Sequence, residues 1–449
     1  MEIMEKILRY KGVIEGFYGP MWRHEERLHL IRHMREWNMN IYIYSPRNDP
    51  YHRFCWNLPY PAQEMKNFTE LAKECKRNGI EFSYAVSPGS SFNPDDPQCR
   101  KALIRKLKPF IELGCKFFPV FYDDITVSFG FDTAEGEKQA ERQAKTMNNI
   151  VNDMVKLSPN ARFLFCPTQY MTAEKSRYLC RLHAILDRRV ETVVTGVDPD
   201  TDGVCPRTFS DAGAKRYFEN FGRRPFFWDN FNVRDNALNI LHWSPYSGRG
   251  ANLDKLCTGI VLNPQNHYIL NIPIFGCMGD YLKNPRKYNP QKSMKKHLEK
   301  FMGQQAAPLG MILSKWFTSE WFAGKGSGFL LSENNLPPIK EKLKSHANAR
   351  YALLKEIRKR MVSLCNFDVH FENTPMPTQV AASLIVYAHL LSEYAKAMVE
   401  FCDTVLRKEK NCKEAGRRLL ERVDRPETEC FRLPFSLIAY ARECAKIAD

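Results

Sequence analysis

Short apolar runs alternate with longer amphipathic segments over about the first 270 residues of the chain. Each run is rich in β-branched and aromatic residues, and each is followed by a segment whose apolar residues recur every three or four positions. The runs are typical of buried strands and the segments of amphipathic helices. Eight runs fit this description: Lys11 to Gly19, Asn40 to Arg47, Ile80 to Gly89, Cys115 to Asp124, Arg162 to Tyr170, Glu191 to Pro199, Arg224 to Asn232 and Gly259 to Asn266.

This succession of strand and helix units predicts the fold class. Eight βα units in this length predict an α/β fold in which residues 1–300 form a TIM-like (β/α)8 barrel. An open doubly wound sheet is the alternative, but the number of strands and the polar residues at their ends favour a closed barrel. The segment after the first predicted strand also lacks the GxGxxG spacing of a dinucleotide-binding loop.

The pattern changes near Gly310, where strand-like runs stop and long helical patterns begin. We therefore expect an all-α helical bundle domain over residues 310–449. Its most regular helix places apolar residues alternately three and four positions apart, at Leu384, Tyr387, Leu391, Tyr394, Met398, Phe401 and Val405. This apolar seam can pack within the bundle or against a second copy, and we expect a homodimer through these C-terminal helices.

Composition limits the compartment and the partners. The net charge of +15 is spread over predicted helix faces without a nucleic-acid-reading motif, which argues against nucleic acid as a partner. Charged residues among the first eleven argue against a signal peptide, and no run of about 18 uncharged apolar residues predicts a membrane span. The 14 cysteines have no CxxC spacing, which favours free thiols and no metal site. We expect a cytoplasmic or nuclear protein.

Polar residues close the predicted strands, which is where a (β/α)8 barrel carries its catalytic groups. They are Glu15, Arg47 with Asn48 and Asp49, Ser87, Asp123 with Asp124, Gln169 with Tyr170, Asp198, Asp229 with Asn230, and Asn263. The pair Asp123 and Asp124 is the sharpest of these features, because an apolar run leads directly into two carboxylates.

Two adjacent carboxylates suit the cleavage of a glycosidic bond. Like charges and partial burial raise the pKa of one carboxyl, so that one group can donate a proton while the other stays ionised. Glycoside hydrolysis needs this division of roles. A helix cap, a turn or a magnesium site would use an Asp-Asp pair as well, so the pair alone leaves these alternatives open.

The segment WDNFN places the large aromatic side chain of Trp228 beside the amide of Asn230, and Asp235 follows in the next loop. A flat aromatic surface next to hydrogen-bonding groups matches a sugar ring, which has apolar faces and a polar rim. Tyr170 and Asn263 add polar groups from other strands. The alternative is a buried structural tryptophan with solvated neighbours.

In this order, these motifs resemble those of glycoside hydrolase family 84, the β-N-acetylglucosaminidases. The resemblance covers roughly Lys11 to Asn266, through GVIEGFYG, YSPRNDPYHR, YAVSPG, FYDDI, FLFCPTQY, VTG, WDN and VLNPQN. It implies a retaining, substrate-assisted reaction, in which the 2-acetamido oxygen of the sugar attacks the anomeric carbon to form an oxazoline. By their places in FYDDI, Asp123 would orient the acetamido N–H and Asp124 would act as acid and base.

The resemblance also implies the contacts with the sugar. Gly16 would bind through its backbone, Tyr170 would line the acetamido pocket and Trp228 would help to enclose it. The sugar's amide and hydroxyl groups would be held by Asn230, Asp235 and Asn263. The implied substrates are O-GlcNAc-modified proteins or GlcNAc-terminated glycans, and no metal or organic cofactor is implied.

Two positions depart from the family pattern. The usual lysine of the YxPKxD motif is Arg47 here, and the tryptophan that often precedes the TG dipeptide is Val194. Because the planar guanidinium group is larger than an ammonium group, we expect the sugar contacts at Arg47 to be rearranged.

Two other functions remain open: a sugar-binding protein that has lost turnover, and a glycosidase for free glycans such as chitin or hyaluronan fragments.

Overall fold

The computed structural model describes residues 8–125, 127–199, 203–235, 241–317, 347–407, 411–423, 433 and 435–446. The chain divides into two compact units. The barrel unit comprises Met1–Asp235, Tyr246–Tyr268 and Met278–Asn289, and the helical unit comprises Asn236–Pro245, Ile269–Cys277 and Pro290–Asp449. Short segments before residue 290 thus belong to the helical unit, while the domain ranges 1–300 and 310–449 stay predictions.

Eight parallel strands form the barrel in the order β3-β2-β1-β8-β7-β6-β5-β4. They are β1 (Tyr10–Glu15), β2 (Ile41–Tyr44), β3 (Glu81–Tyr84), β4 (Phe117–Phe121), β5 (Arg162–Cys166), β6 (Val190–Val194), β7 (Pro225–Asp229) and β8 (Gly259–Leu262). Strands β3 and β4 meet just beyond the end of β3, where the N–H of Val86 donates to Pro119 O at 3.0 Å and the N–H of Phe121 donates to Val86 O at 3.0 Å. This contact closes the barrel and confirms the predicted fold class over the open sheet.

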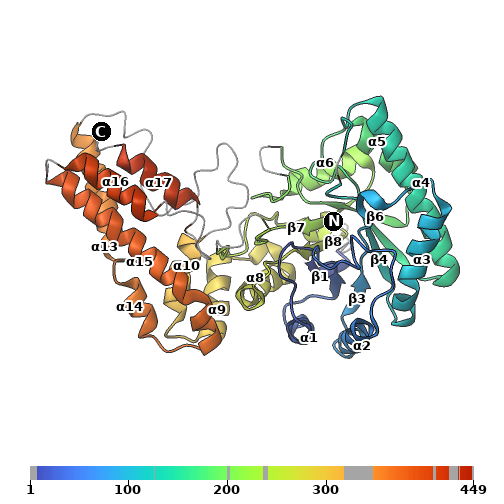
Figure 1. Cartoon of the computed structure of the whole chain (residues 1–449), viewed down its shortest axis with the longest axis horizontal. Coiled ribbons are helices and arrows are strands. Elements are labelled where there is room, and N and C mark those ends of the chain that lie inside the picture. The colour runs from blue at the N-terminus through green and yellow to red at the C-terminus, as the bar shows by residue number, and fades with distance from the viewer. Residues whose placement is uncertain are drawn as a thin grey trace, which may run out of the picture. The chain divides into compact units, whose positions relative to one another are not determined.

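Helices cover the outside of the strands (Figure 1). They are α1 (His24–His33), α2 (Ala62–Arg77), α3 (Pro97–Glu112), α4 (Ala134–Leu157), α5 (Arg177–Ile185), α6 (Asp211–Phe221) and α7 (Leu253–Leu256). The next helix, α8 (Ile272–Lys283), is divided between the two units, and 3-10 turns lie at Gly89–Ser91, Tyr268–Asn271 and Pro285–Lys287. Four of these helices begin at a side chain that accepts a backbone N–H, namely Asp96, Thr133, Ser176 and Ser210. These N-caps end the loops that follow β3 to β6, and so they border the face of the barrel at the C-terminal ends of its strands.

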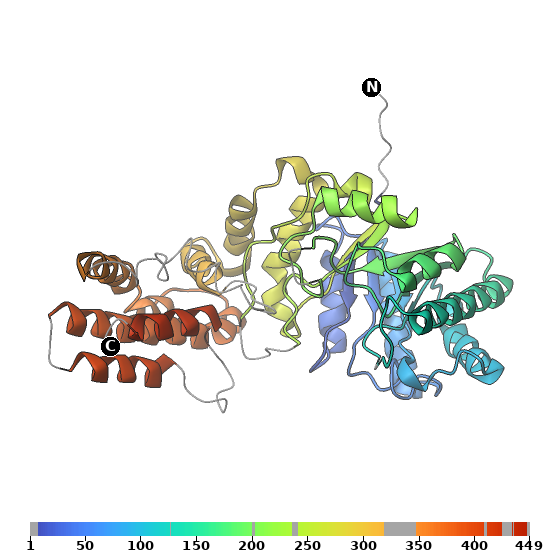
Figure 2. The same ribbon diagram turned by 90° about the horizontal axis from the view of Figure 1, so that it is seen from above.

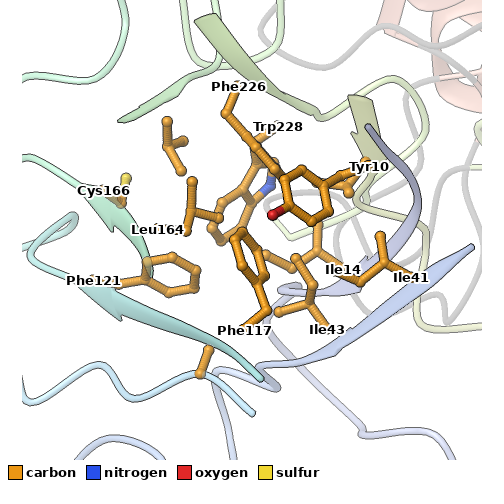
Figure 3. Close-up of a cluster of buried hydrophobic side chains, with 13 residues drawn as sticks. Tyr10, Ile14, Ile41, Ile43, Phe117, Phe121, Leu164, Cys166, Phe226 and Trp228 are labelled. Carbon is orange, nitrogen blue, oxygen red and sulfur yellow. The ribbon is translucent and has the colours of Figure 1, made fainter. Parts of the chain in front are cut away.

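Aromatic and branched side chains fill the barrel interior (Figure 3). Tyr10 and Phe117 stack with ring centroids 4.5 Å apart, and Phe226 packs against both. Nearer the C-terminal ends of the strands, the rings of Phe121 and Trp228 lie 5.2 Å apart. The interior is thus a packed core, so a polar site can form only beyond this last aromatic layer.

The helical unit contains α9 (Pro290–Met302), α10 (Ala307–Trp316), α13 (Ala347–Val362), α14 (Phe367–Glu372), α15 (Thr378–Leu406), α16 (Cys412–Val423) and α17 (Phe435–Ala445). In Figures 1 and 2, α13, α15, α16 and α17 lie alongside one another. The seven seam residues on α15 are buried within the chain, and the Tyr394 hydroxyl donates to Leu437 O at 3.2 Å. Helices of the same unit therefore fill the seam. The seam is therefore not a free surface for a second copy, and a homodimer stays a prediction.

Two further observations concern the described part of the chain. No helix in it is both long and apolar enough to cross a membrane. Its cysteines are free thiols, most of them buried. Residues 1–7, on which the expectation about a signal peptide mainly rests, lie outside the described residues.

Candidate active site

The two adjacent carboxylates follow the end of β4, where the backbone changes direction. Asp123 continues the strand alternation of Phe121, and the residue as a whole is buried, with 4% of its surface exposed. Asp124 is exposed and has a φ of 50°, in the left-handed region that aspartate tolerates better than most residues. Such a conformation costs on the order of 1 kcal/mol and is common at functional sites. It breaks the strand alternation and allows Asp124 to reach two tyrosine hydroxyls.

Asp123 forms a buried ion pair with Arg47, which lies just after β2. Arg47 also donates to Ser87 Oγ at 3.2 Å, and its guanidinium group lies 5.3 Å from the ring centre of Trp228. The other carboxylate oxygen, Asp123 Oδ1, is buried and has no hydrogen-bond partner among the residues that the structure describes. Burial raises the pKa of Asp123, and the positive charge of Arg47 offsets only part of this effect. One buried acceptor oxygen thus remains available to a ligand.

Asp124 is held by two hydroxyl groups. The Tyr18 hydroxyl donates to its Oδ2 at 2.8 Å and the Tyr170 hydroxyl to its Oδ1 at 3.0 Å. Arg53 donates to the backbone oxygen of Asp124 at 3.0 Å and to the Tyr18 hydroxyl. The surrounding side chains partly desolvate the Asp124 carboxyl, which acts to raise its pKa, but Arg47 and the two tyrosine hydrogen bonds outweigh this effect and lower the pKa below its usual value. The two carboxyls therefore differ in pKa, with Asp123 the higher of the two.

A chain of hydrogen-bonded amide groups contacts Trp228. The N–H of Gly16 donates to Asn263 Oδ1 at 3.1 Å, and Asn263 Nδ2 donates to Asn230 Oδ1 at 2.9 Å. The Trp228 indole N–H donates to that Asn230 oxygen at 2.9 Å, while Asn230 Nδ2 donates to Val204 O at 2.7 Å. A Cβ atom on Gly16 would lie 2.4 Å from the Trp228 ring, so this approach requires glycine.

Asp235 connects a second loop to the site. Its Oδ1 accepts the N–H of Tyr18 at 2.7 Å, which links Asp235 through Tyr18 to Asp124. Burial raises the pKa of Asp235 to about 7. A carboxyl with this pKa exists in both protonation states near neutral pH.

The structure brings every residue predicted for the site into one connected group. Its members are Gly16, Arg47, Asp123, Asp124, Tyr170, Trp228, Asn230, Asp235 and Asn263. Tyr18 and Arg53 join the group although sequence reasoning did not single them out. The one available signal for Tyr18 was its place in the EGFYG loop directly after a predicted strand.

Other polar residues at strand ends have structural partners instead. Glu15 pairs with Arg27 at 2.7 Å, and Asp229 pairs with Arg249. Asp49 accepts hydrogen bonds from the hydroxyls of Tyr44 and Tyr60, and Asp198 accepts from Ser210 and Thr208. Within the described ranges, no three His, Cys, Asp or Glu side chains cluster in a way that could hold a metal ion.

The arrangement combines the groups that sugar chemistry needs. Two carboxyls of different pKa lie beside aromatic rings, and amide groups and a third carboxyl surround them. Aromatic faces bind the C–H surface of a sugar, and amides and carboxylates bind its hydroxyls. Acid and base chemistry at a glycosidic bond is therefore possible here.

Comparisons with known proteins agree with this description. Residues 11–313 match the family model described as beta-N-acetylglucosaminidase. Protein O-GlcNAcase from Rattus norvegicus and that from Mus musculus are each 29% identical over 280 residues, a match that covers 61% of this chain but only 30% of each relative's length. A solved structure of a Thermobaculum terrenum O-GlcNAc hydrolase mutant shares the fold, with a TM-score of 0.81, 22% identity, and coverage of 98% of this chain and 94% of that chain. The chain therefore belongs to the β-N-acetylglucosaminidases, glycoside hydrolase family 84.

Proposed function

We propose that this protein hydrolyses terminal β-linked N-acetylglucosamine with retention of configuration, by substrate-assisted catalysis. The main support is the buried, unpartnered Oδ1 of Asp123 beside the hydroxyl-bonded carboxyl of Asp124. A buried acceptor without a partner is costly, at about 1–3 kcal/mol. The acetamido N–H of the sugar would supply the missing hydrogen bond.

In the first step, the acetamido carbonyl oxygen of the substrate forms a bond to C1 while the C1–O bond to the leaving group breaks. Asp124 gives its proton to the departing oxygen. Asp123 accepts the acetamido N–H, and its negative charge stabilises the positive charge that develops as the oxazoline forms. In the second step Asp124 takes a proton from water, the water oxygen bonds to C1, and the ring oxygen of the oxazoline leaves.

The acid role requires a protonated Asp124, whereas its tyrosine hydrogen bonds stabilise the ionised form. We propose that the leaving oxygen replaces one of the two tyrosine hydroxyls when substrate binds. The bound sugar also displaces water from the site. Both changes raise the pKa of Asp124 towards the value that an acid needs.

The other site residues would hold the sugar ring. The backbone of Gly16 and the amides of Asn230 and Asn263 form one hydrogen-bonded chain, which supports roles in binding hydroxyl groups. Trp228 would enclose the acetamido group and Tyr170 would line its pocket. Asp235, whose carboxyl accepts the N–H of Tyr18, would also accept hydrogen bonds from sugar hydroxyls.

As the natural substrate we propose O-GlcNAc on Ser or Thr of modified proteins. Its support is the name of the mammalian relatives and the cytoplasmic location expected from the sequence. A glycopeptide with one O-GlcNAc group should be cleaved with a higher kcat/KM than chitobiose or a GlcNAc-ended hyaluronan fragment. Faster cleavage of the free glycans would reverse this assignment.

Substitution of the substrate tests the mechanism. An aryl β-N-acetylglucosaminide should be hydrolysed, and its N-trifluoroacetyl analogue should react much more slowly, because fluorine withdraws electrons from the attacking oxygen. Steady-state kcat for the mono-, di- and trifluoroacetyl series measures this dependence. Equal rates across the series would exclude the acetamido oxygen as nucleophile, and binding without hydrolysis of any of them would favour a sugar-binding protein.

A further inference from the structure

Arg47 occupies the position of the family's lysine, but it makes its contacts with the protein. Its side chain is 2% exposed. One terminal nitrogen pairs with Asp123 Oδ2, and the other donates to Ser87 Oγ at 3.2 Å. One face of the guanidinium group lies 5.3 Å from the Trp228 ring centre, within the range of a cation–π contact.

This geometry depends on the shape of arginine. The planar fork bridges Asp123 and Ser87 at the same time, which a single ammonium group cannot do with fixed geometry. Both terminal nitrogens of Arg47 donate hydrogen bonds, and its Nε is buried without a partner among the described residues. Asp123, in contrast, uses only Oδ2 and leaves Oδ1 unpartnered. The Arg47 contact therefore fixes which oxygen of Asp123 is available.

We propose that Arg47 is a positioning residue, which holds Asp123 Oδ2 so that Oδ1 accepts the substrate's acetamido N–H, and which supplies the counter-charge for this carboxylate. The inference rests on the proposed function and changes the role expected for Arg47 from sugar contact to support of Asp123. The hydrogen bond to Ser87 on the loop after β3 in turn fixes the guanidinium group.

The charges around Asp123 make this role measurable. Arg47 is the largest influence that lowers the pKa of Asp123, with a smaller one from Arg53, while Asp124 raises it. Burial raises the pKa of Cys166 and of Tyr170, so both stay neutral at physiological pH. Asp123 must be ionised to stabilise the developing positive charge. Removal of Arg47 would therefore raise the pKa of Asp123. Activity would then fall at a higher pH on the acid side of the pH profile than it does in the wild type.

The experiment is the pH dependence of kcat and KM on an aryl β-N-acetylglucosaminide for wild type, Arg47→Met and Arg47→Lys. In Arg47→Met the acid limb of kcat should move up by about one pH unit or more, with KM changed less than about threefold. Arg47→Lys should keep the acid limb near its wild-type pH, because the positive charge remains. The same variant should lower kcat, because the planar guanidinium group that bridges Asp123 and Ser87 is lost. Arg249→Met removes another buried arginine of an aspartate pair and should not move the limb.

The outcomes separate the two proposals. A wild-type protein that does not hydrolyse the aryl substrate contradicts the proposed function. An active wild type whose Arg47→Met variant has a raised KM and an unmoved acid limb shows that Arg47 binds the sugar directly, and overturns the inference alone. If Arg47→Met does not fold, Arg47→Lys decides. Lower kcat at unchanged KM supports positioning, and higher KM at unchanged kcat contradicts it.

Discussion

Two buried Arg–Asp pairs lie at strand ends of the same barrel, and they differ in how completely they are hydrogen-bonded. In the pair of Arg249 with Asp229, both carboxylate oxygens accept from the guanidinium group. The remaining nitrogen of Arg249 donates to two backbone oxygens, and the Tyr246 hydroxyl donates to Asp229 at 2.7 Å. Both side chains are at most 1% exposed. Each guanidinium nitrogen and each carboxylate oxygen of this pair thus has at least one protein partner.

The pair of Arg47 with Asp123 is almost as deeply buried, with side chains 2% and 5% exposed, but it is incomplete. Within the described part of the chain, Asp123 Oδ1 and Arg47 Nε have no hydrogen-bond partners. Buried polar groups are nearly always satisfied, so an exception needs an explanation. Burial and ion pairing therefore do not distinguish a structural Arg–Asp pair from a functional one. A buried acceptor oxygen without a partner, such as Asp123 Oδ1, does distinguish them.

The largest expected effect separates the two aspartates. Asp123→Asn should lower kcat by about 10³-fold, because the amide cannot carry the charge that stabilises the oxazoline-forming step. Asp229→Asn should mainly lower the free energy of unfolding of the barrel unit, by about 3–5 kcal/mol, since it leaves Arg249 buried without its partner charge. Steady-state kinetics and denaturant unfolding of both variants check this. A loss of kcat in Asp229→Asn as large as that in Asp123→Asn would contradict the comparison.

Asp124 should show a smaller effect that depends on the leaving group. Asp124→Asn should lower kcat/KM by about 10²-fold for an O-GlcNAc peptide, whose alkoxide needs a proton to depart. For an aryl substrate with an acidic phenol, the loss should be below about tenfold. Measurement over a series of phenols gives the dependence on leaving-group pKa. Equal losses along the series would remove Asp124 from the acid role.

The strands and their order could be predicted because their signal is local. Each predicted run contains one observed strand or most of it, and the site residues predicted at the strand ends lie together at the C-terminal face of the barrel. The pattern of apolar runs reports burial on both sides, which only a sheet covered by helices provides. The barrel therefore followed from the sequence without any contact information.

The roles of neighbouring polar residues could not be predicted in the same way. Asp229 and Asn230 are adjacent in WDNFN, yet Asp229 pairs with Arg249 while Asn230 joins the amide chain with Trp228. The partner of Asp229, Arg249, lies 20 residues away in sequence, and Asn230 bonds to Asn263 and to Val204 O, which are also distant in sequence. Sequence gives the residue types at a strand end, but their partners are set by the tertiary structure.

The seam on α15 (Thr378–Leu406) shows a different limit of the sequence. Its three- and four-residue spacing is the same whether the helix packs inside a bundle or against a second copy. The described helices of the same unit cover it, as the burial of Leu391 and Met398 shows. Periodicity identifies an apolar face, but it does not identify what the face contacts.

Gly16 borders Trp228, whose ring contacts Arg47 of the incomplete pair. In Gly16→Ala the new Cβ would meet the Trp228 ring at 2.4 Å, and overpacking of this kind costs about 1–3 kcal/mol. Because Trp228 also contacts Arg47, we expect a raised KM and weaker sugar binding, by about tenfold. Trp228→Phe in the same chain removes the clashing ring atoms and should restore part of the loss. A double variant that is no better than the sum of the single losses would show that the clash is not the cause.

The smallest expected effect is a pH dependence that belongs to Asp235, a carboxyl without an arginine partner at hydrogen-bonding distance among its described contacts. Burial raises its pKa to about 7, against about 3.9 for an aspartate in an unfolded chain. The folded protein therefore binds this proton more tightly than the unfolded chain does, so the contribution of Asp235 to stability is full below about pH 4 and is lost as the pH rises through 7.

Sugar binding should change with pH in the opposite direction, because the ionised carboxylate of Asp235 accepts hydroxyl hydrogen bonds better than the protonated form does. Between pH 8 and pH 6, wild type should lose affinity for N-acetylglucosamine by about threefold to tenfold, while Asp235→Asn should bind more weakly and lose less over that range. Isothermal titration calorimetry at several pH values measures both proteins, and Asp123 and Asp124 are unchanged in both, so their own titration cancels in the comparison. Parallel pH profiles for the two proteins would show that the buried carboxyl of Asp235 does not accept the sugar's hydroxyls.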